Sequence, residues 1–329
     1  MDAEIFAEWL RRQGHQVVRT ESSYWYDAGP RVYQAFPFGW VIQPDEKELR
    51  ELIRSQGAVA LRYSTSVEFP EGLISYHVVL RKPYDLNLVD HRARNGIKSG
   101  LRSCQVEPIS LKRLAEDGWL LQKDTLERQG RLDSMSQSEW VKICSSAEGL
   151  AGFEAWGAII EGELVASLLT ARIDNTWYVP YAQCLQKYMK QHINNALFYA
   201  ASCDMLSREG VDGIFYSLHS LDAPESINEF KFRMGFIGKP VRQRVVFAPW
   251  LRPFASRINH RLLQYLAQRY PQSVFLSKAE GMLRFCVQGK RPLSDQDWPK
   301  CLSNFKESYF RSEFTNEHSL SIIGTLDKE

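Results

Sequence analysis

The side chains best suited to acid–base chemistry follow an apolar segment, residues 211–218, that is typical of a strand. His219 comes directly after it, and because an imidazole titrates near neutral pH, it could take a proton from a substrate. Asp222 could orient that imidazole, although an aspartate in this position is also typical of a helix N-cap. We predict His219 and Asp222 as a catalytic pair. The alternative is that His219 has no catalytic role and only stabilises a loop.

Basic side chains recur one helical turn apart on a helix predicted from about Leu86 to Arg102. They share one face, which could bind a phosphate of a donor or of tRNA, although such stripes are usually solvated. Lys187 and Lys190 could bind phosphate in a later connection. No P-loop, dinucleotide-binding or zinc-binding motif occurs, so we expect no metal. The stripe consists of His91, Arg94, Lys98 and Arg102.

Three extended segments joined by tight turns form the clearest pattern of elements in the chain. Gly162 stands where the first tight turn needs a glycine. Pro180 lies in the third segment, and because proline has no N–H to donate, it predicts a bulge or an edge there. We predict an antiparallel meander over residues 153–160, 164–171 and 176–183.

Helices and strands alternate on both sides of this meander, which predicts an α/β (α+β) fold with mixed central sheets flanked by helices. The tail from Pro249 to about Phe285 is mostly helical in pattern. The chain after the meander is predicted to form a helix over 193–208, a strand over 211–218, a short helix over 222–234 and a strand over 241–247.

The order of meander, helix, strand, short helix and strand resembles the GNAT acyltransferase fold, best from about Gly152 to Phe247 and less well over residues 45–128. In residues 228–236 a helix with Phe and Lys ends in Gly-Phe, which is similar to a late motif of that superfamily. With His219 before it, the segment is more similar to the Fem-type branch, whose members carry two GNAT-like halves. The helix with Arg92, Arg94 and Lys98 also resembles a Fem-type feature.

The resemblance implies where a donor and an acceptor would meet. In a GNAT-like fold they gather where the last meander strand and the next parallel strand part, which here are the ends of residues 178–183 and 216–219. Trp156 and Tyr178 would line the cleft on the substrate side, or else belong to the core. The resemblance also implies cofactor-binding roles for Tyr181, Gln183, Lys187 and Lys231, the last through a phosphate or an acyl carbonyl.

One segment departs from the GNAT pattern. GNAT enzymes usually hold the coenzyme A phosphates on the bare amides of a glycine-containing loop before a helix. Residues 184–192 occupy that place and contain no glycine. Fem-type members also lack this loop, and some of them take the acyl group from aminoacyl-tRNA.

Composition excludes several classes of protein. A hydrophobic fraction of 44% and a charged fraction of 24% exclude a largely disordered chain. A net charge of +2 gives no general argument for a nucleic-acid or membrane partner. An acidic start without a long apolar run predicts a cytoplasmic protein without a cleaved signal or a membrane span. The six cysteines are expected to be reduced thiols.

We therefore predict an acyltransferase, chiefly an N-acyltransferase, that moves an acyl group from acyl-CoA to an amine or hydroxyl of a small molecule or cell-envelope precursor. One alternative is an aminoacyl-tRNA-dependent transferase, which the lack of basic excess disfavours. The other is a GNAT-like binding protein without activity. We expect an N-terminal half over residues 1–135 and a C-terminal half with a helical tail over residues 136–329.

Overall fold

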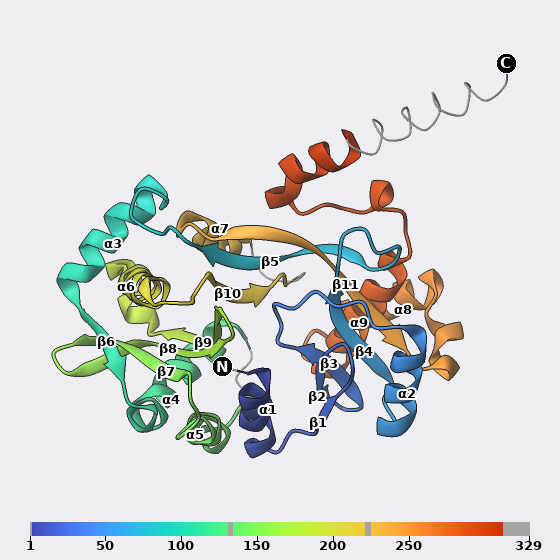
Figure 1. Ribbon diagram of the computed structural model, residues 1–329, viewed down its shortest axis with the longest axis horizontal. Coiled ribbons are helices and arrows are strands. Elements are labelled where there is room, and N and C mark those ends of the chain that lie inside the picture. The colour runs from blue at the N-terminus through green and yellow to red at the C-terminus, as the bar shows by residue number, and fades with distance from the viewer. Residues whose placement is uncertain (1, 131–133, 221–224, 312–329) are drawn as a thin grey trace.

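One open, mixed sheet of eleven strands runs through the part of the chain that the computed structural model describes, residues 2–130, 134–220 and 225–311 (Figure 1). Of residues 225–228 only the backbone is described. The strand order is β1-β2-β3-β4-β11-β5-β10-β9-β8-β7-β6. The strands are β1 (Val17–Arg19), β2 (Tyr24–Gly29), β3 (Val32–Phe36), β4 (Ala60–Thr65), β5 (Leu73–Arg81), β6 (Gln105–Ile109), β7 (Phe153–Ile160), β8 (Glu163–Ile173), β9 (Thr176–Cys184), β10 (Gly213–Leu218) and β11 (Ile237–Phe247).

Most of the helices begin at a serine or aspartate whose side chain accepts an N–H of the first turn. At Ser136 the carboxylate of Glu139 also accepts the cap N–H, which completes a capping box. The α-helices are α1 (Ala3–Arg12), α2 (Glu46–Gln56), α3 (His91–Ser103), α4 (Leu111–Arg128), α5 (Gln137–Ser146), α6 (Ile193–Ser207), α7 (Glu225–Arg233), α8 (Arg257–Arg269) and α9 (Val274–Gly289). Short 3-10 helices include η2 (Gln186–Gln191) and η3 (Pro249–Phe254).

The sheet interleaves segments that are far apart in the sequence. β11 lies between β4 and β5 and is antiparallel to both. At one edge of the sheet, β6 pairs with β7. The first residue of β7, Phe153, comes 44 residues after Ile109, the last residue of β6. The division into halves at residue 135 stays a prediction.

Helices cover both faces of the meander formed by β7, β8 and β9. Trp177 and Tyr178 are neighbours on β9, and successive side chains of a strand point to opposite faces. Trp177 packs in one cluster with Leu197 of α6, whereas Tyr178 belongs to a cluster with Trp140 of α5. Helices α3 and α6 therefore cover one face, and α1, α4 and α5 cover the other (Figure 1).

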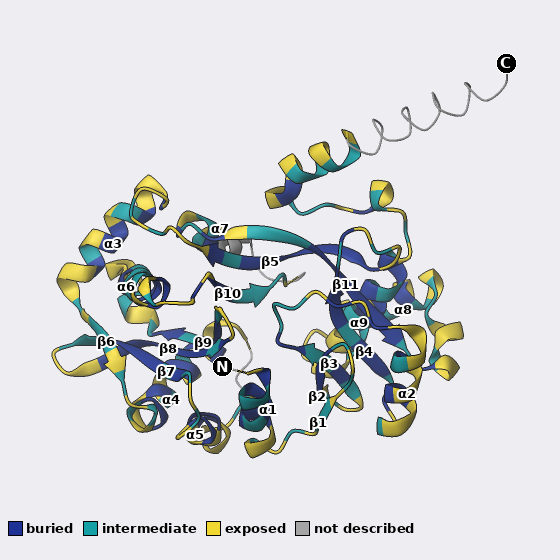
Figure 2. Ribbon diagram, in the orientation of Figure 1, coloured by how far each residue is buried: buried dark blue, intermediate teal, exposed yellow. Residues whose placement is uncertain are grey.

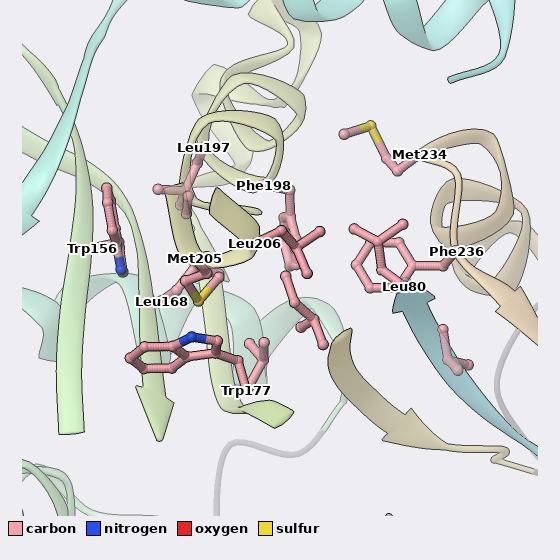
Figure 3. Close-up of a cluster of buried hydrophobic side chains, with 14 of the residues drawn as sticks. Leu80, Trp156, Leu168, Trp177, Leu197, Phe198, Met205, Leu206, Met234 and Phe236 are labelled. Carbon is pink, nitrogen blue, oxygen red and sulfur yellow. The ribbon is translucent and has the colours of Figure 1, made fainter. Parts of the chain in front are cut away.

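The largest hydrophobic core lies between the sheet and α6 (Figure 3). Side chains from β5, the meander, α6 and the segment between α7 and β11 meet there, and the buried members are at most 8% exposed. Burial of this apolar surface anchors the two strands that carry the candidate site, β9 and β10. The labelled members are Leu80, Trp156, Leu168, Trp177, Leu197, Phe198, Met205, Leu206, Met234 and Phe236.

The predicted α/β fold class and the meander are confirmed. The helix predicted from Leu86 was placed too early, because Asp90 caps α3 and the helix begins at His91. Strand β6 was not predicted, since a short segment that contains Pro108 carries no clear alternation of apolar residues.

Candidate functional site

The parallel strands β9 and β10 pair only at their beginnings. Their register runs from Thr176 opposite Gly213 to Tyr178 opposite Phe215 and ends there. Strand β9 continues to Cys184 beside β8 alone, and β10 continues to Leu218 beside β5 alone. We call the facing edges of residues 179–184 and 216–218, which form no ladder with each other, the strand wedge.

Pro180 helps to open the strand wedge. It has no N–H and follows Tyr178, the last residue of β9 paired with β10, by two positions. The register between β8 and β9 also shifts here, because Leu169 lies opposite Tyr181 while Ala171 lies opposite Tyr178. Of the bulge or edge predicted at Pro180, the structure has a bulge.

Lys231 of α7 reaches β10 at the strand wedge. Its Nζ donates to the hydroxyl oxygen of Ser217 at 3.0 Å and lies 4.9 Å from the ring centroid of Tyr216. The residue is buried, with 7% of its surface exposed. In the described residues no carboxylate forms an ion pair with it.

Burial lowers the pKa of Lys231 from its ordinary value of 10.5 to about 8. An ammonium group that has lost water without gaining an opposite charge is electrostatically unsatisfied. A phosphate or a developing oxyanion beside Nζ would supply the missing charge. Such a perturbed group next to parted strands is typical of a functional site.

His219 follows β10 near Lys231. Its backbone N–H donates to the carbonyl of Tyr76 at 3.0 Å, and its ring stacks on the Tyr76 ring with centroids 4.3 Å apart. The Ser75 hydroxyl lies 3.4 Å from its Nδ1. The structure thus brings His219 and Lys231 to the same end of β10, where Ser217 contacts Lys231 two residues before His219. Asp222, the predicted partner, lies outside the described residues.

The two predicted donor contacts on β9 have different surroundings. Tyr181 is half-buried in the strand wedge and packs edge-to-face on Trp140, with centroids 5.5 Å apart. Gln183 is 1% exposed, accepts from Ser167 at 2.9 Å and donates to Gln122 of α4 at 3.0 Å. A contact between Gln183 and a donor would require this buried chain of hydrogen bonds to open.

Lys187 lies on η2 at the surface and pairs with Glu163 at 3.0 Å. This carboxylate raises the pKa of the lysine. The loop that contains Lys187 lacks glycine, yet His192 supplies a left-handed turn at φ 61° directly before α6. Gly96 and Gly100 of α3 pack against this residue, so α3 and the start of α6 lie in close contact.

The two predicted substrate contacts lie in different places. Trp156 is in the hydrophobic core of Figure 3 and is 3% exposed. Tyr178 lines a cavity of about 530 Å³ and packs on Phe215, with ring centroids 5.2 Å apart. Because Tyr178 and Phe215 are the last residues paired between β9 and β10, this cavity, which we call the sheet cavity, adjoins the start of the strand wedge.

The sheet cavity is lined by charged groups of both signs. The basic residues are Arg81, Lys82 and Lys239, and the acidic residues are Asp174 and Asp212. A polar ligand with both an anionic and a cationic group would match this lining.

His77 of β5 is one of the sheet-cavity residues that sequence reasoning missed. It is fully buried, and its Nε2 lies 2.8 Å from the hydroxyl of Ser64. Desolvation, with a smaller contribution from Lys239, lowers the pKa of His77 to about 3, so the ring is neutral. The signal in the sequence that could have identified His77 is the presence of a titratable residue inside the apolar run of residues 74–80.

One ring nitrogen of His77 has no partner. Ser64 accepts from the side-chain amide of Gln243 at 2.5 Å and keeps both a proton and a second lone pair, so it can bind His77 Nε2 in either tautomer. Among the described residues, Nδ1 is buried without a hydrogen-bond partner. His77 therefore adds an unpartnered polar atom to the wall of the sheet cavity, which a polar group of a ligand would satisfy.

The architecture is similar to that of solved structures. The structure of FemX superposes with a TM-score of 0.53 at 12% identity, over 80% of this chain and 93% of that one. A conserved protein of unknown function from Bacteroides thetaiotaomicron gives a TM-score of 0.50 at 11% identity, over 74% of this chain and 88% of that one. No family model and no curated protein matches the sequence.

Two observations agree on the fold. The sheet carries a meander followed by a parallel strand that parts from it, and the chain superposes on most of FemX. The chain therefore shares the overall fold of FemX.

Proposed function

We propose that the protein is an acyltransferase whose donor carbonyl lies in the strand wedge beside Lys231. The observation that carries the proposal is the buried amine of Lys231, which pairs with no carboxylate among the described side chains, at the place where β9 and β10 part. In transfer to an amine, the nitrogen attacks the carbonyl carbon, an N–C bond forms, and the bond to the leaving group breaks. Negative charge develops on the carbonyl oxygen, where the Lys231 ammonium donates a hydrogen bond.

Proton transfer is proposed for His219. It lies at the end of β10, two residues beyond the Ser217 hydroxyl that binds Lys231, and an imidazole can accept the acceptor's proton near neutral pH. Asp222 stays the proposed partner of this histidine. The leaving group departs with its electron pair, and the proton on His219 can pass to it.

The proposed donor is an acyl thioester of coenzyme A. The left-handed turn at His192 lets the chain enter α6 without a glycine, and no side chain caps this helix start. Lys187 and Lys190 flank it on η2. Phosphates would be held here by first-turn amides and lysines, and the thioester supplies the activated acyl group.

A thermal-shift titration with coenzyme A, acetyl-CoA and a long-chain acyl-CoA tests the donor, because a ligand of the native state raises the apparent stability. We expect a saturable rise in melting temperature with at least one thioester, and weaker binding in Lys187→Ala. Lys112→Ala, an exposed lysine of α4, is the matched control. No shift with any thioester would contradict this donor.

Aminoacyl-tRNA is the second candidate donor. The observation in its favour is the exposed basic face of α3, which carries His91, Arg92, Lys98 and Arg102 beside the start of α6. Charged tRNA would then raise the melting temperature where the thioesters do not. A protein that binds neither donor would be a GNAT-like binding protein.

The proposed acceptor site is the sheet cavity. Its polar lining suits a small molecule or a cell-envelope precursor that carries an amine or hydroxyl and a polar group that can hydrogen-bond to Nδ1 of His77. We expect His77→Phe to raise the KM for the acceptor at least about tenfold, since one buried hydrogen bond is lost, while donor binding stays unchanged. Steady-state kinetics with varied acceptor measures this, and an unchanged KM would remove His77 from the acceptor site.

A further inference from the structure

The C-terminal helices carry an unusual share of the exposed apolar surface. Of the fifteen large hydrophobic side chains that are exposed in the described part of the chain, eight fall between residues 250 and 275. They include Trp250 and Phe254 on η3, which are 64% and 61% exposed, and Phe275 at the start of α9, which is 75% exposed.

Helix α8 presents an apolar stripe to solvent. Ile258, Leu262 and Tyr265 are spaced by four and three residues, so they lie on one face, and they are 79%, 57% and 62% exposed. The opposite side of α8 packs on α9, where His260 Nε2 lies 2.9 Å from the carboxylate of Glu280. Figure 2 shows α8 as a largely exposed helix at the edge of the molecule.

The charge of this region has a single sign. Between residues 249 and 279 the sequence has five lysines and arginines and no aspartate or glutamate. Arg252 contacts Glu46 at 3.7 Å, whereas in the described residues Arg257, Arg261, Arg269 and Lys278 form no ion pair. Arg257 and Arg261 are one turn apart on the exposed side of α8, next to the stripe.

We propose that η3 and α8 dock on an anionic phospholipid surface, with α8 lying in the plane of the interface. Apolar and aromatic side chains on one face with arginines beside them are typical of helices that bind lipid headgroups and insert shallowly. Tryptophan and tyrosine favour this depth, and each basic side chain adds attraction to anionic lipid. In the described residues no helix combines the length and the apolar character needed to cross a bilayer.

Charge argues against a second copy of the chain as the occupant. A twofold interface places the same patch on both subunits, so the unpaired basic side chains of one copy would face those of the other. An anionic lipid surface has the complementary charge.

Vesicle flotation of the full chain tests the proposal, with phosphatidylcholine alone and phosphatidylcholine mixed with phosphatidylglycerol. We expect flotation only with the anionic vesicles, and its loss at high salt. The variant Ile258→Ser/Leu262→Ser should bind at least about tenfold more weakly, because it removes the apolar stripe. Arg257→Gln/Arg261→Gln should also bind more weakly, because it removes charge.

Matched variants on α4 and α5 control for the general effects of removing exposed apolar or charged side chains. Leu120→Ser/Val141→Ser removes two exposed apolar side chains, and Lys112→Gln/Lys123→Gln removes two exposed charges. Both should float as the unchanged protein does. No flotation with anionic vesicles, or equal losses in the controls, would overturn the proposal. A dimer in solution that only the stripe variant converts to monomer would assign the surface to self-association instead.

Discussion

Replacing Lys231 with methionine is expected to stabilise the protein at pH 7 while it lowers acyl transfer about 100- to 1,000-fold. The loss of activity follows from removing the donor to the oxyanion. The gain in stability follows from burial: the pKa of Lys231 is lowered to about 8, so the folded state holds the ammonium at a cost. We expect the free energy of unfolding to rise by about 1–3 kcal/mol, after the lost hydrogen bond to Ser217 is counted.

The sign of the pH dependence follows from the same pKa. In the unfolded chain the lysine titrates near 10.5, so between about pH 8 and 10.5 the unfolded state binds more protons. Stability of the unchanged protein therefore rises with pH across this window, and the advantage of Lys231→Met shrinks. Below pH 8 both states hold the proton, and the advantage is constant.

Urea denaturation at pH 7 and pH 10, with acyl transfer measured as thiol release, checks both effects. Lys123→Met, an exposed lysine of α4, is the control and should change stability by less than about 0.5 kcal/mol. Activity of the unchanged protein should fall above about pH 8, since the ammonium form donates to the oxyanion. A destabilised Lys231→Met variant, or one with full activity, would refute this role.

A methyl group added to α3 at Gly100 is expected to destabilise the fold by about 1–3 kcal/mol. A Cβ there would lie 2.5 Å from the carbonyl oxygen of His192 and 2.9 Å from the Cβ of Ala196. A backbone carbonyl at a helix start cannot turn aside, so α3 and α6 must separate. The variant Gly100→Ala should therefore also weaken thioester binding at the start of α6.

The same substitution at Gly281 in α9 is a matched control. A Cβ at Gly281 meets no atom within 4 Å, so Gly281→Ala should stabilise the protein by about 0.5–1 kcal/mol through helix propensity. Chemical denaturation of the two variants gives the comparison. If Gly100→Ala is as stable as Gly281→Ala, the close packing of α3 on α6 is not as described.

Local patterns predicted much of the fold. The meander and helix α4 follow from apolar periodicity, and the bulge follows from Pro180, whose missing N–H is visible in the sequence. The divergence of β9 and β10 was expected from the resemblance to the GNAT fold, and the register confirms that these strands part.

Other features depend on contacts between distant residues, which local patterns do not report. The placement of β11 between β4 and β5 joins residues at least 158 positions apart in the sequence, as the pairing of Ile237 with Val79 illustrates. Gln183 and Trp156 carry polar or aromatic groups typical of a site, yet their neighbours place them in the interior. His77 became a candidate only once Ser64, Gln243 and the sheet cavity lay around it.

Amide hydrogen exchange with and without a saturating acyl donor tests most directly whether the donor occupies the strand wedge. The facing edges of residues 179–184 and 216–218 form no ladder with each other, so a bound donor should slow exchange of amides on these edges. Exchange within α4 and β8 should change little. Protection that centres on the strand wedge and is lost in Lys231→Met is the result we predict. Saturable binding that protects other segments and leaves these amides unchanged would contradict the proposed site.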